Sequence, residues 1–278
     1  TRSPGSYPLM RVVVLAAMPQ EIRPLLESVG GWRPVEGAPF PTWRGWVERT
    51  DVCVVQTGIG GERAGRAARQ MLGGPPVDLV ISAGFAGSLC PDFRLGQPVW
   101  SRELITLNGG DGKPAIAGYH PGVPSALTVF NRSHTLRPAR FVTVDRIHAK
   151  AELVGRFAAT PSVVEMESTV VAGAAREQDV PFLGIRTISD EWDEEIDWQP
   201  ETVVNAEGVI LPARLAWALC RRPALLRSLL RLRRNSMVAG CALAHMLSAV
   251  VGLPEERLRT LVEELRQPFR SSSSCQRA

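Results

Sequence analysis

Near its start the chain reads Arg11-Val-Val-Val-Leu-Ala-Ala17, with Pro19 two residues further on. A short apolar run of this kind predicts a buried strand. Proline is tolerated in the first turn of a helix, and Ile22, Leu25 and Leu26 then form an apolar stripe at helical spacing. A strand that leads directly into a helix is the unit from which α/β folds are built.

The same alternation continues along most of the chain. Further strands are expected at 43–47, 51–56, 77–82, 97–107, 141–144 and 181–188, and helices after Gly61, at 149–157 and at 168–176. The segment 108–122 is rich in Gly and Pro and is expected to be a loop. The predicted fold class is therefore α/β, with a mixed, mostly parallel sheet flanked by helices.

The chain changes character from residue 202 onward, where the pattern becomes almost wholly helical. We expect a flexible arm at 1–10, a catalytic α/β domain at 11–200, a helical C-terminal extension of the same domain at 201–268, and a disordered tail at 269–278. Within the extension, helices are expected at 211–219, 225–234, 239–251 and 255–266.

Composition excludes several classes of function. The 278 residues are 45% apolar and 22% charged, which suits one globular domain, and a net charge of +4 without interleaved aromatic and basic residues argues against nucleic-acid binding. The five cysteines and four histidines are scattered, so neither a metal site nor an organic cofactor is expected. Scattered cysteines and the lack of a signal-peptide core or membrane-spanning run predict a cytoplasmic protein.

Carboxylates stand where two of the predicted strands end. Glu165 and Glu167 close one short apolar run, and Asp190 closes another. Ionisable groups at the ends of central strands must be paired, hydrogen-bonded or used on a ligand. Structural roles are equally open from the residues alone: Asp190 could cap a helix, Glu167 could favour a helix dipole, and Glu21 could be a solvated charge in a first helical turn.

Five segments in order then resemble a known family. They are Ala17-Met18-Pro19-Gln20-Glu21, Thr57-Gly58-Ile59-Gly60, Ala83-Gly84-Phe85-Ala86-Gly87, Val164-Glu165-Met166-Glu167 and Ile188-Ser189-Asp190. They are similar to the successive signatures of the nucleoside phosphorylase superfamily, in the branch of methylthioadenosine/S-adenosylhomocysteine nucleosidases. The resemblance implies a partly barrel-like sheet and cleavage of the bond between a purine and its ribose.

The resemblance also implies roles for individual residues. Asp190 would protonate the departing purine while Ser189 orients it, and Glu21 would activate the attacking water. Glu167 would hold the ribose hydroxyls. Met166 would pack on the ribose face, although a core methionine is the plain alternative.

Further substrate-binding positions follow from the same resemblance. The glycine segments at 57–61 and 84–87 would bring the backbone close to the ligand, so Phe85, Ala86 and Gly87 are included among the binding residues. Glu165 belongs to the same set, although neighbouring residues on a strand face opposite ways. Ile147 completes the set, because the segment 144–147 stands where the family has an aromatic stretch that stacks on the purine, which leaves base specificity open.

Departures from the family pattern favour water over phosphate as the nucleophile. The early segment carries Glu21 where phosphorylases have Gly-Asp-Pro, and Ser82-Ala83 stands where a phosphorylase offers an arginine. A phosphate dianion would find little cationic support there, although Arg63 or Arg186 could still reach it. Gly58 and Gly60 do not complete a dinucleotide-binding fingerprint, because position 63 is not glycine.

The C-terminal region has a resemblance of its own. Arg221-Arg222-Pro223-Ala224-Leu225-Leu226 and Leu229-Leu230-Arg231-Leu232 are similar to the end of hopanoid-associated phosphorylases, which implies adenosylhopane as a substrate and a leucine-faced basic helix that could lie on anionic lipid. Helices packed on the core are the plain alternative. Relatives imply a homodimer. Two other functions stay open: phosphorolysis giving ribose 1-phosphate, and non-catalytic nucleoside binding.

Overall fold

The computed structural model describes residues 10–107, 114–120, 122–128, 130, 136–146, 148–194 and 225–266, with backbone only at 225–229. The strands are β1 (Arg11–Ala16), β2 (Arg33–Pro34), β3 (Thr42–Val47), β4 (Thr50–Gln56), β5 (Leu79–Ser88), β6 (Pro98–Leu107), β7 (Pro114–Tyr119), β8 (Arg137–Val144), β9 (Ser162–Glu165) and β10 (Phe182–Asp190). The helices are α1 (Pro19–Ser28), α2 (Gly61–Leu72), α3 (Ser125–Thr128), α4 (Lys150–Phe157), α5 (Ser168–Glu177), α7 (Leu225–Val251) and α8 (Glu255–Arg266).

One mixed sheet bends until part of it closes on itself. Its order is β10-β6-β8-β9-β5-β1-β4-β3-β2, and β10 also pairs with β5, which completes a ring of five strands. The longest pairings are parallel, including the pairs β1 with β4, β5 with β10 and β6 with β8. The predicted α/β fold with a partly barrel-like sheet is confirmed.

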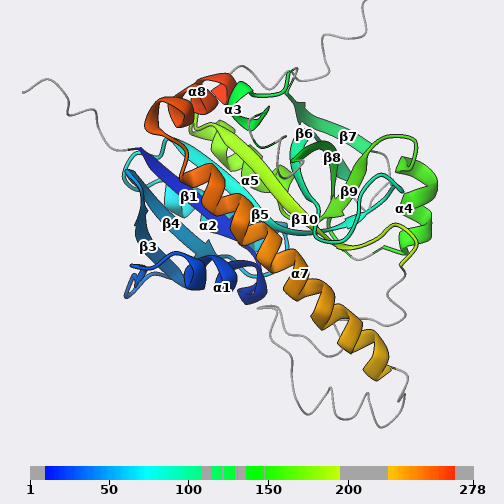
Figure 1. Ribbon diagram of the computed structural model, residues 1–278. Coiled ribbons are helices and arrows are strands. Elements are labelled where there is room, and N and C mark those ends of the chain that lie inside the picture. Colours follow the sequence, from blue (N-terminus) through cyan, green and yellow to red (C-terminus); the bar gives the residue numbers. More distant parts are fainter. Residues whose placement is uncertain are drawn as a thin grey trace, which may run out of the picture.

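Helices cover both faces of the sheet, as the alternation along β1 requires. Val12 and Val14 lie in a core shared with α1, α7 and α8, whereas Val13 and Leu15 lie in a core shared with α2 and α5. Figure 1 shows α7 crossing one face of β1, β5 and β10 while α2 and α5 lie behind them. Successive side chains of a strand point to opposite faces, so a continuous apolar run is the pattern of a strand buried on both sides.

The structure corrects the sequence interpretation at several elements. The segment 108–122 was expected to be a loop, but β7 forms at its centre because residues 114–119 pair with β6. Strand β5 does not end at residue 82 but continues to Ser88, since β10 pairs along its whole length. The short elements β2 and α3 lack a periodic pattern and were not predicted, whereas β9 corresponds to the short apolar run that was expected to end at Glu165 and Glu167. The expected helix at 211–219 and Ile147 lie outside the described residues, as do most of the expected arm and tail.

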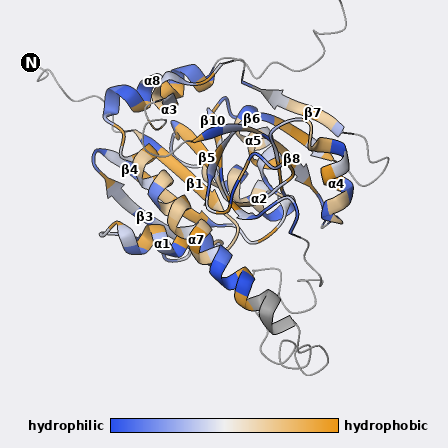
Figure 2. Cartoon of the chain, turned by 45° about the vertical axis from the view of Figure 1, so that its right-hand side comes forward, coloured by the Kyte–Doolittle hydropathy of each residue, from blue (hydrophilic) through white to orange (hydrophobic). Residues whose placement is uncertain are grey.

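The two helical segments expected at 225–234 and 239–251 form one helix, α7. Its second half is buried, with Leu243 and Leu247 in the core, but near its beginning Leu230 and Met237 are 57% and 62% exposed. Figure 2 shows the first half projecting from the body of the molecule. Among the described helices none is by itself long and apolar enough to span a membrane, although α7 from Leu230 and α8, bent by 100° at their junction, would pass as a pair on length and composition.

Candidate functional site

The carboxyl ends of β1, β5, β9 and β10 meet at one region of the sheet. β5 lies beside β1 and β10 in parallel register, and Gly87 near its end pairs with Val164 of β9. β9 runs antiparallel to β5, so its carboxyl end reaches this region from the opposite direction. In α/β sheets the carboxyl ends of parallel strands such as β1, β5 and β10 are where ligands usually bind.

Glu21 is buried at this edge and is not a solvated charge. Its exposed fraction is 3%, and its Oε2 atom accepts hydrogen bonds from the backbone N–H groups of Ala17 and Met18, both at 2.8 Å. Its Oε1 atom accepts the N–H of Phe85 at 2.8 Å. Burial raises the pKa of Glu21, against the lowering effect of these hydrogen bonds and of Arg186. A Cβ atom on Gly84 would lie 2.7 Å from Oε1, so only glycine leaves room for this carboxylate.

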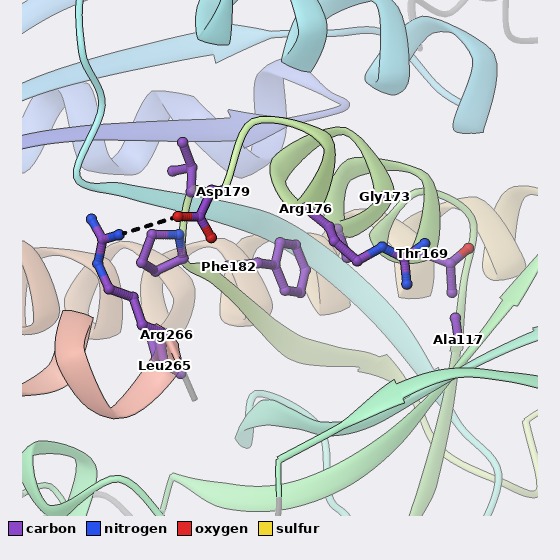
Figure 3. Close-up of a pocket in the computed structure, with 11 residues that line it drawn as sticks. Ala117, Thr169, Gly173, Arg176, Asp179, Phe182, Leu265 and Arg266 are labelled. Atoms are coloured by element: carbon purple, nitrogen blue, oxygen red, sulfur yellow. Dashed lines mark ion pairs between the residues drawn. The ribbon is translucent and has the colours of Figure 1, made fainter. Parts of the chain in front are cut away.

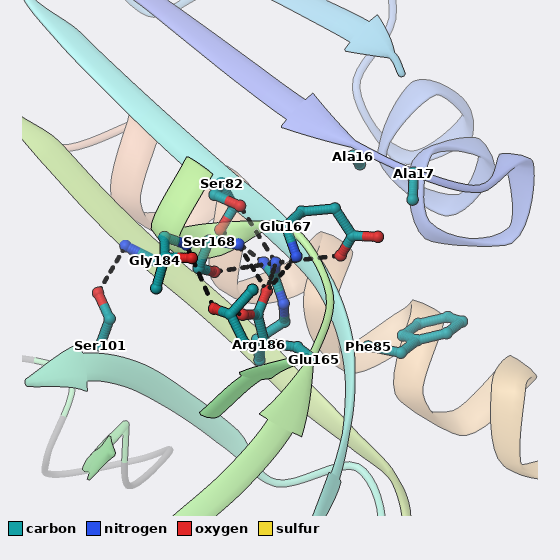
Figure 4. A network of polar contacts seen from close by, with 12 residues as sticks. Ala16, Ala17, Ser82, Phe85, Ser101, Glu165, Glu167, Ser168, Gly184 and Arg186 are labelled. Carbon is teal, nitrogen blue, oxygen red and sulfur yellow. Dashed lines mark hydrogen bonds and ion pairs between the residues drawn. The ribbon is translucent and has the colours of Figure 1, made fainter. Parts of the chain in front are cut away.

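A buried ion pair between Arg186 and Glu165 lies in the same region (Figure 4). Arg186 donates to Glu165 at 2.6 Å, and the two side chains are 1% and 0% exposed. Arg186 also donates to the carbonyl and hydroxyl of Ser82 and to the hydroxyl of Ser168, while Thr143 donates to Glu165. Burial alone would raise the pKa of Glu165, but the guanidinium and these hydrogen bonds lower it. Glu165 therefore lies inside the scaffold rather than on an open surface.

Glu167 lies at the start of α5 and faces the glycine segment. Its Oε1 atom accepts the N–H of Gly60 at 2.9 Å, and its Oε2 atom lies 3.7 Å from Arg186. Gly60 has a φ of 99°, a conformation that glycine adopts without strain. Burial, and then the charge of Glu165, raise the pKa of Glu167 to about 7. The Glu167 side chain is nevertheless 15% exposed.

Asp190 is the last residue of β10 and no helix follows it in residues 191–194, so it is not a helix cap. Ser189 donates to its Oδ1 atom at 2.7 Å, and Lys150 donates to its Oδ2 atom. A Cβ atom on Gly87 would lie 2.7 Å from Oδ2, so this glycine also makes room for a carboxylate. Gly84 and Gly87 of one strand thus seat Glu21 and Asp190.

Comparison with known proteins agrees with this arrangement. The family model described as the phosphorylase superfamily matches residues 11–213. The chain belongs to the phosphorylase superfamily. The match ends before α7, so the resemblance of the C-terminal region to hopanoid-associated phosphorylases receives no support from it.

Several solved structures share this fold. S-adenosylhomocysteine nucleosidase from Streptococcus pyogenes matches with a TM-score of 0.66 and 18% identity, covering 90% of this chain and 100% of that one. The 5′-methylthioadenosine/S-adenosylhomocysteine nucleosidase from Neisseria meningitidis gives 0.64 and 20%, with coverages of 88% and 99%. Futalosine hydrolase from Helicobacter pylori gives 0.60 and 18%, with 92% and 98%. At these identities the similarity shows a shared fold.

Of the remaining predicted site residues, those that the structure describes lie around the same region of this superfamily fold. Met166 is partly buried and packs on the small core that includes Val142 and Leu153. Phe85 is also partly buried, and Ala86 is buried with its carbonyl accepting the Ser189 hydroxyl at 3.4 Å.

Sequence reasoning missed Lys150 and gave Arg186 only a conditional role toward phosphate. Neither residue stands in a periodic pattern. The one available signal is that Lys150 is one of only two lysines in a chain whose positive charge is nearly all arginine.

The most prominent pocket of the described residues does not coincide with this cluster. It has a volume of about 280 Å³ and lies where β10 begins, lined by Phe182, Thr169, Arg176 and Arg266 among others (Figure 3). Asp190 is at the other end of the same strand, roughly 26 Å away at about 3.3 Å per residue. Because Arg176 and Asp179 at its rim are exposed, we assign the chemistry to the buried carboxylates instead. Among the described residues no group of three His, Cys, Asp or Glu side chains is placed to hold a metal ion.

Proposed function

We propose that this protein cleaves the N-glycosidic bond of a 5′-substituted adenine nucleoside and releases adenine. The observation that carries the proposal is the convergence of Glu21, Glu167 and Asp190, from three distant segments, at one edge of the sheet. The similar solved structures are nucleosidases for methylthioadenosine and S-adenosylhomocysteine and a hydrolase for futalosine, which supports this reaction class.

The chemistry asks for groups of these types. Departure of a purine leaves positive charge on the ribose, so the reaction benefits from an acid at the base and a carboxylate near the sugar. Asp190, with Ser189 orienting it, acts at the base. Glu167 accepts hydrogen bonds from the ribose hydroxyls, and its partial exposure supports this role. Glu21 activates the nucleophile, while Glu165 and Arg186 hold Glu167 in place.

We propose water as the nucleophile because the cluster is rich in carboxylates. Glu21, Glu165 and Glu167 gather around Arg186, whose side chain is 1% exposed and already bonded to Glu165, Ser82 and Ser168. A phosphate dianion would meet repulsion from the carboxylates and gain little from a guanidinium whose two terminal nitrogens already donate to Ser82, Glu165 and Ser168.

Phosphorolysis is the second candidate, and one observation favours it. The side chain of Arg63 lies against the glycine segment, since a Cβ atom on Gly58 would be 2.8 Å from its Nε atom. This guanidinium stands near the position from which a phosphate could be held, and the product would then be ribose 1-phosphate.

The 5′ substituent is proposed to be apolar, as in methylthioadenosine or a bulkier adenosylhopane-type nucleoside. Gly240 of α7 lies beside Phe85, so this helix passes the candidate site. Just before it, Leu230, Leu232, Met237 and Val238 are exposed, and Arg231, Arg233 and Arg234 are exposed among them. Such a surface suits an apolar substituent, a second subunit of a homodimer or an anionic lipid surface. A cytoplasmic location stays a prediction.

The test is release of adenine from methylthioadenosine, with and without phosphate, by the wild type and by Asp190→Asn. We expect release that does not require phosphate and that Asp190→Asn abolishes. Release only with phosphate would replace water by phosphate. Nucleoside binding without release from methylthioadenosine, S-adenosylhomocysteine or a long-chain 5′-alkyl adenosine would identify a non-catalytic binding protein.

A further inference from the structure

Lys150 is the residue of this site that the proposed chemistry has not yet used. It is the first residue of α4, and its side chain is 10% exposed. Its ammonium donates to Oδ2 of Asp190 and to the backbone carbonyl of Glu191. The second bond ties Lys150 to the turn that follows β10, so the lysine is fixed relative to the carboxylate from both sides.

The position of Lys150 on its helix is unfavourable by itself. A cation in the first turn faces the positive end of the helix dipole, and the residue at the N-cap of α4 is Ala149, whose side chain cannot cap the helix. The pairing with Asp190 offsets this cost. The helix dipole disfavours a lysine at this position, so the pairing with Asp190 is what holds the side chain there. We therefore look for the role of Lys150 at Asp190.

Both oxygens of Asp190 are occupied by donors. Oδ1 accepts the hydroxyl of Ser189 and Oδ2 accepts the ammonium of Lys150. An ammonium that donates to the carboxyl group of the proposed acid can serve as a source of the proton that the purine receives.

We propose that Lys150 is this source, so that the acid of the reaction is the Lys150–Asp190 pair; this inference rests on the proposed function. As the C1′–N9 bond breaks, its electron pair stays on the purine. Lys150 gives a proton to Asp190, which gives a proton to N7, and Lys150 becomes a neutral amine. Water bonds to C1′ and loses a proton to Glu21, which releases it to the solvent, from which Lys150 recovers one. The sum is nucleoside and water giving purine and the 5′-substituted ribose.

The other charged groups around this corner are engaged with each other. The Glu191 carboxylate pairs with Arg94 at 3.1 Å, and Glu194 accepts the backbone N–H of Glu191. His148 lies 3.9 Å from Asp145. Histidine is the side-chain type whose charge ordinarily changes between pH 5 and 8, so a His148→Gln variant is the control for any pH effect assigned to Lys150.

Two substitutions of Lys150 separate proton supply from simple positioning. Arginine keeps the positive charge but does not release a proton, whereas methionine removes the charge and lets Asp190 take a proton from water. For Lys150→Arg we expect kcat to fall about 100-fold at every pH from 6 to 9. For Lys150→Met we expect a similar loss at pH 8 that recovers to within about tenfold of wild type at pH 5.5.

The opposite pattern would overturn the proposal. If Lys150→Arg keeps the wild-type kcat, the lysine only positions Asp190. If Lys150→Met loses the same factor at every pH, the proton does not come from this pair. His148→Gln should leave the shape of the pH profile unchanged, and circular dichroism of each variant checks folding.

A measurement without substrate tests the pair separately from the reaction. In a Lys113→Arg background Lys150 is the one lysine left, so protein labelled with ¹⁵N-lysine gives a single ammonium signal. We expect slow proton exchange and a visible signal at neutral pH that Asp190→Asn abolishes. A signal absent from the parent, or unchanged by Asp190→Asn, overturns the pairing. If the wild type keeps the ammonium signal but does not release adenine, the proposed function is contradicted. If it releases adenine but lacks the signal, only the proton transfer from Lys150 to Asp190 is contradicted.

Discussion

Two ion pairs of this protein differ in what surrounds them. Arg186 and Glu165 are 1% and 0% exposed and share further hydrogen bonds with Ser82, Ser168 and Thr143. Lys150 and Asp190 are 10% and 21% exposed, and each has one further partner, Glu191 and Ser189. The first pair is closed to solvent and holds the fold together. The second pair is partly exposed, and we propose that the substrate approaches from its exposed side.

Removing Arg186 should have the largest effect. Arg186→Met leaves Glu165 buried and unpaired, which we expect to lower the free energy of unfolding by about 3–5 kcal/mol. Urea denaturation measures it. The matched control is Arg66→Met, which breaks the exposed Arg66–Glu62 pair on α2 and should cost about 0.5 kcal/mol or less. If the two substitutions lower the free energy of unfolding equally, the buried Arg186–Glu165 pair contributes no more to stability than an exposed pair.

Asp190→Asn should lower activity much more than stability, which is the opposite of what we expect for Arg186→Met. We expect a loss of about 10²–10⁴-fold in kcat, since this is the usual contribution of a general acid. The free energy of unfolding should change by about 1 kcal/mol or less, because the pair is partly exposed. Steady-state kinetics and urea denaturation on the same sample compare the two. A variant that unfolds but stays active when folded would reverse the assignment.

Glu167 lies 3.7 Å from Arg186 of the first pair, and its pKa of about 7 predicts a pH dependence of stability. The folded state binds a proton more tightly than the unfolded state, whose carboxyl has its ordinary value of 4.5. Stability is therefore highest below about pH 4.5 for this group and falls as the pH rises to about 7, by at most about 3 kcal/mol. Glu167→Gln should flatten this part of the pH–stability curve. An unchanged slope would mean that Glu167 is ionised at neutral pH without cost.

Gly84→Ala should give the smallest effect. The new Cβ atom would meet Glu21 at 2.7 Å, and we expect a destabilisation of about 1–2 kcal/mol together with reduced activity. Gly155→Ala is the matched control: it lies in α4 with no atom within 4 Å of the new Cβ, so it should stabilise the protein by about 0.5–1 kcal/mol. Thermal unfolding of both variants compares them, and a stabilising Gly84→Ala would show that Glu21 can move aside.

Sequence reasoning found the parts of this fold that local pattern determines. β1 and β4 are continuous apolar runs, and both were expected within one residue of their observed bounds. β7 was missed because it contains Pro114 and Gly118, and it becomes a strand only through pairing with β6. Similarly, the small residues of Ala83–Gly87 suggested a loop after a strand, whereas they continue β5 and make room for two carboxylates.

The site was accessible from the sequence only in part. Glu165, Glu167 and Asp190 could be named because they stand at the ends of apolar runs, whereas Glu21 was named only through the family resemblance. Their partners could not, because Lys150 and Asp190 are 40 positions apart and Arg186 and Glu165 are 21 apart. Only closure of the sheet decides that these side chains meet. The roles of the carboxylates remain predictions until the variants are measured.

The ring of strands also determines how late in synthesis the candidate site can form. β5 is joined to β10 through pairs such as Val80 with Phe182, about 100 residues apart, and distant pairings of this kind are slow to form. A nascent chain that has emerged as far as α5 holds Glu21 and Glu167 but neither Arg186 nor Asp190. Synthesis must pass β10 before the ring can close, so a polypeptide interrupted earlier can have no competent centre. We expect refolding to recover enzymatic activity in the slow phase that reports ring closure, after most helical signal has returned.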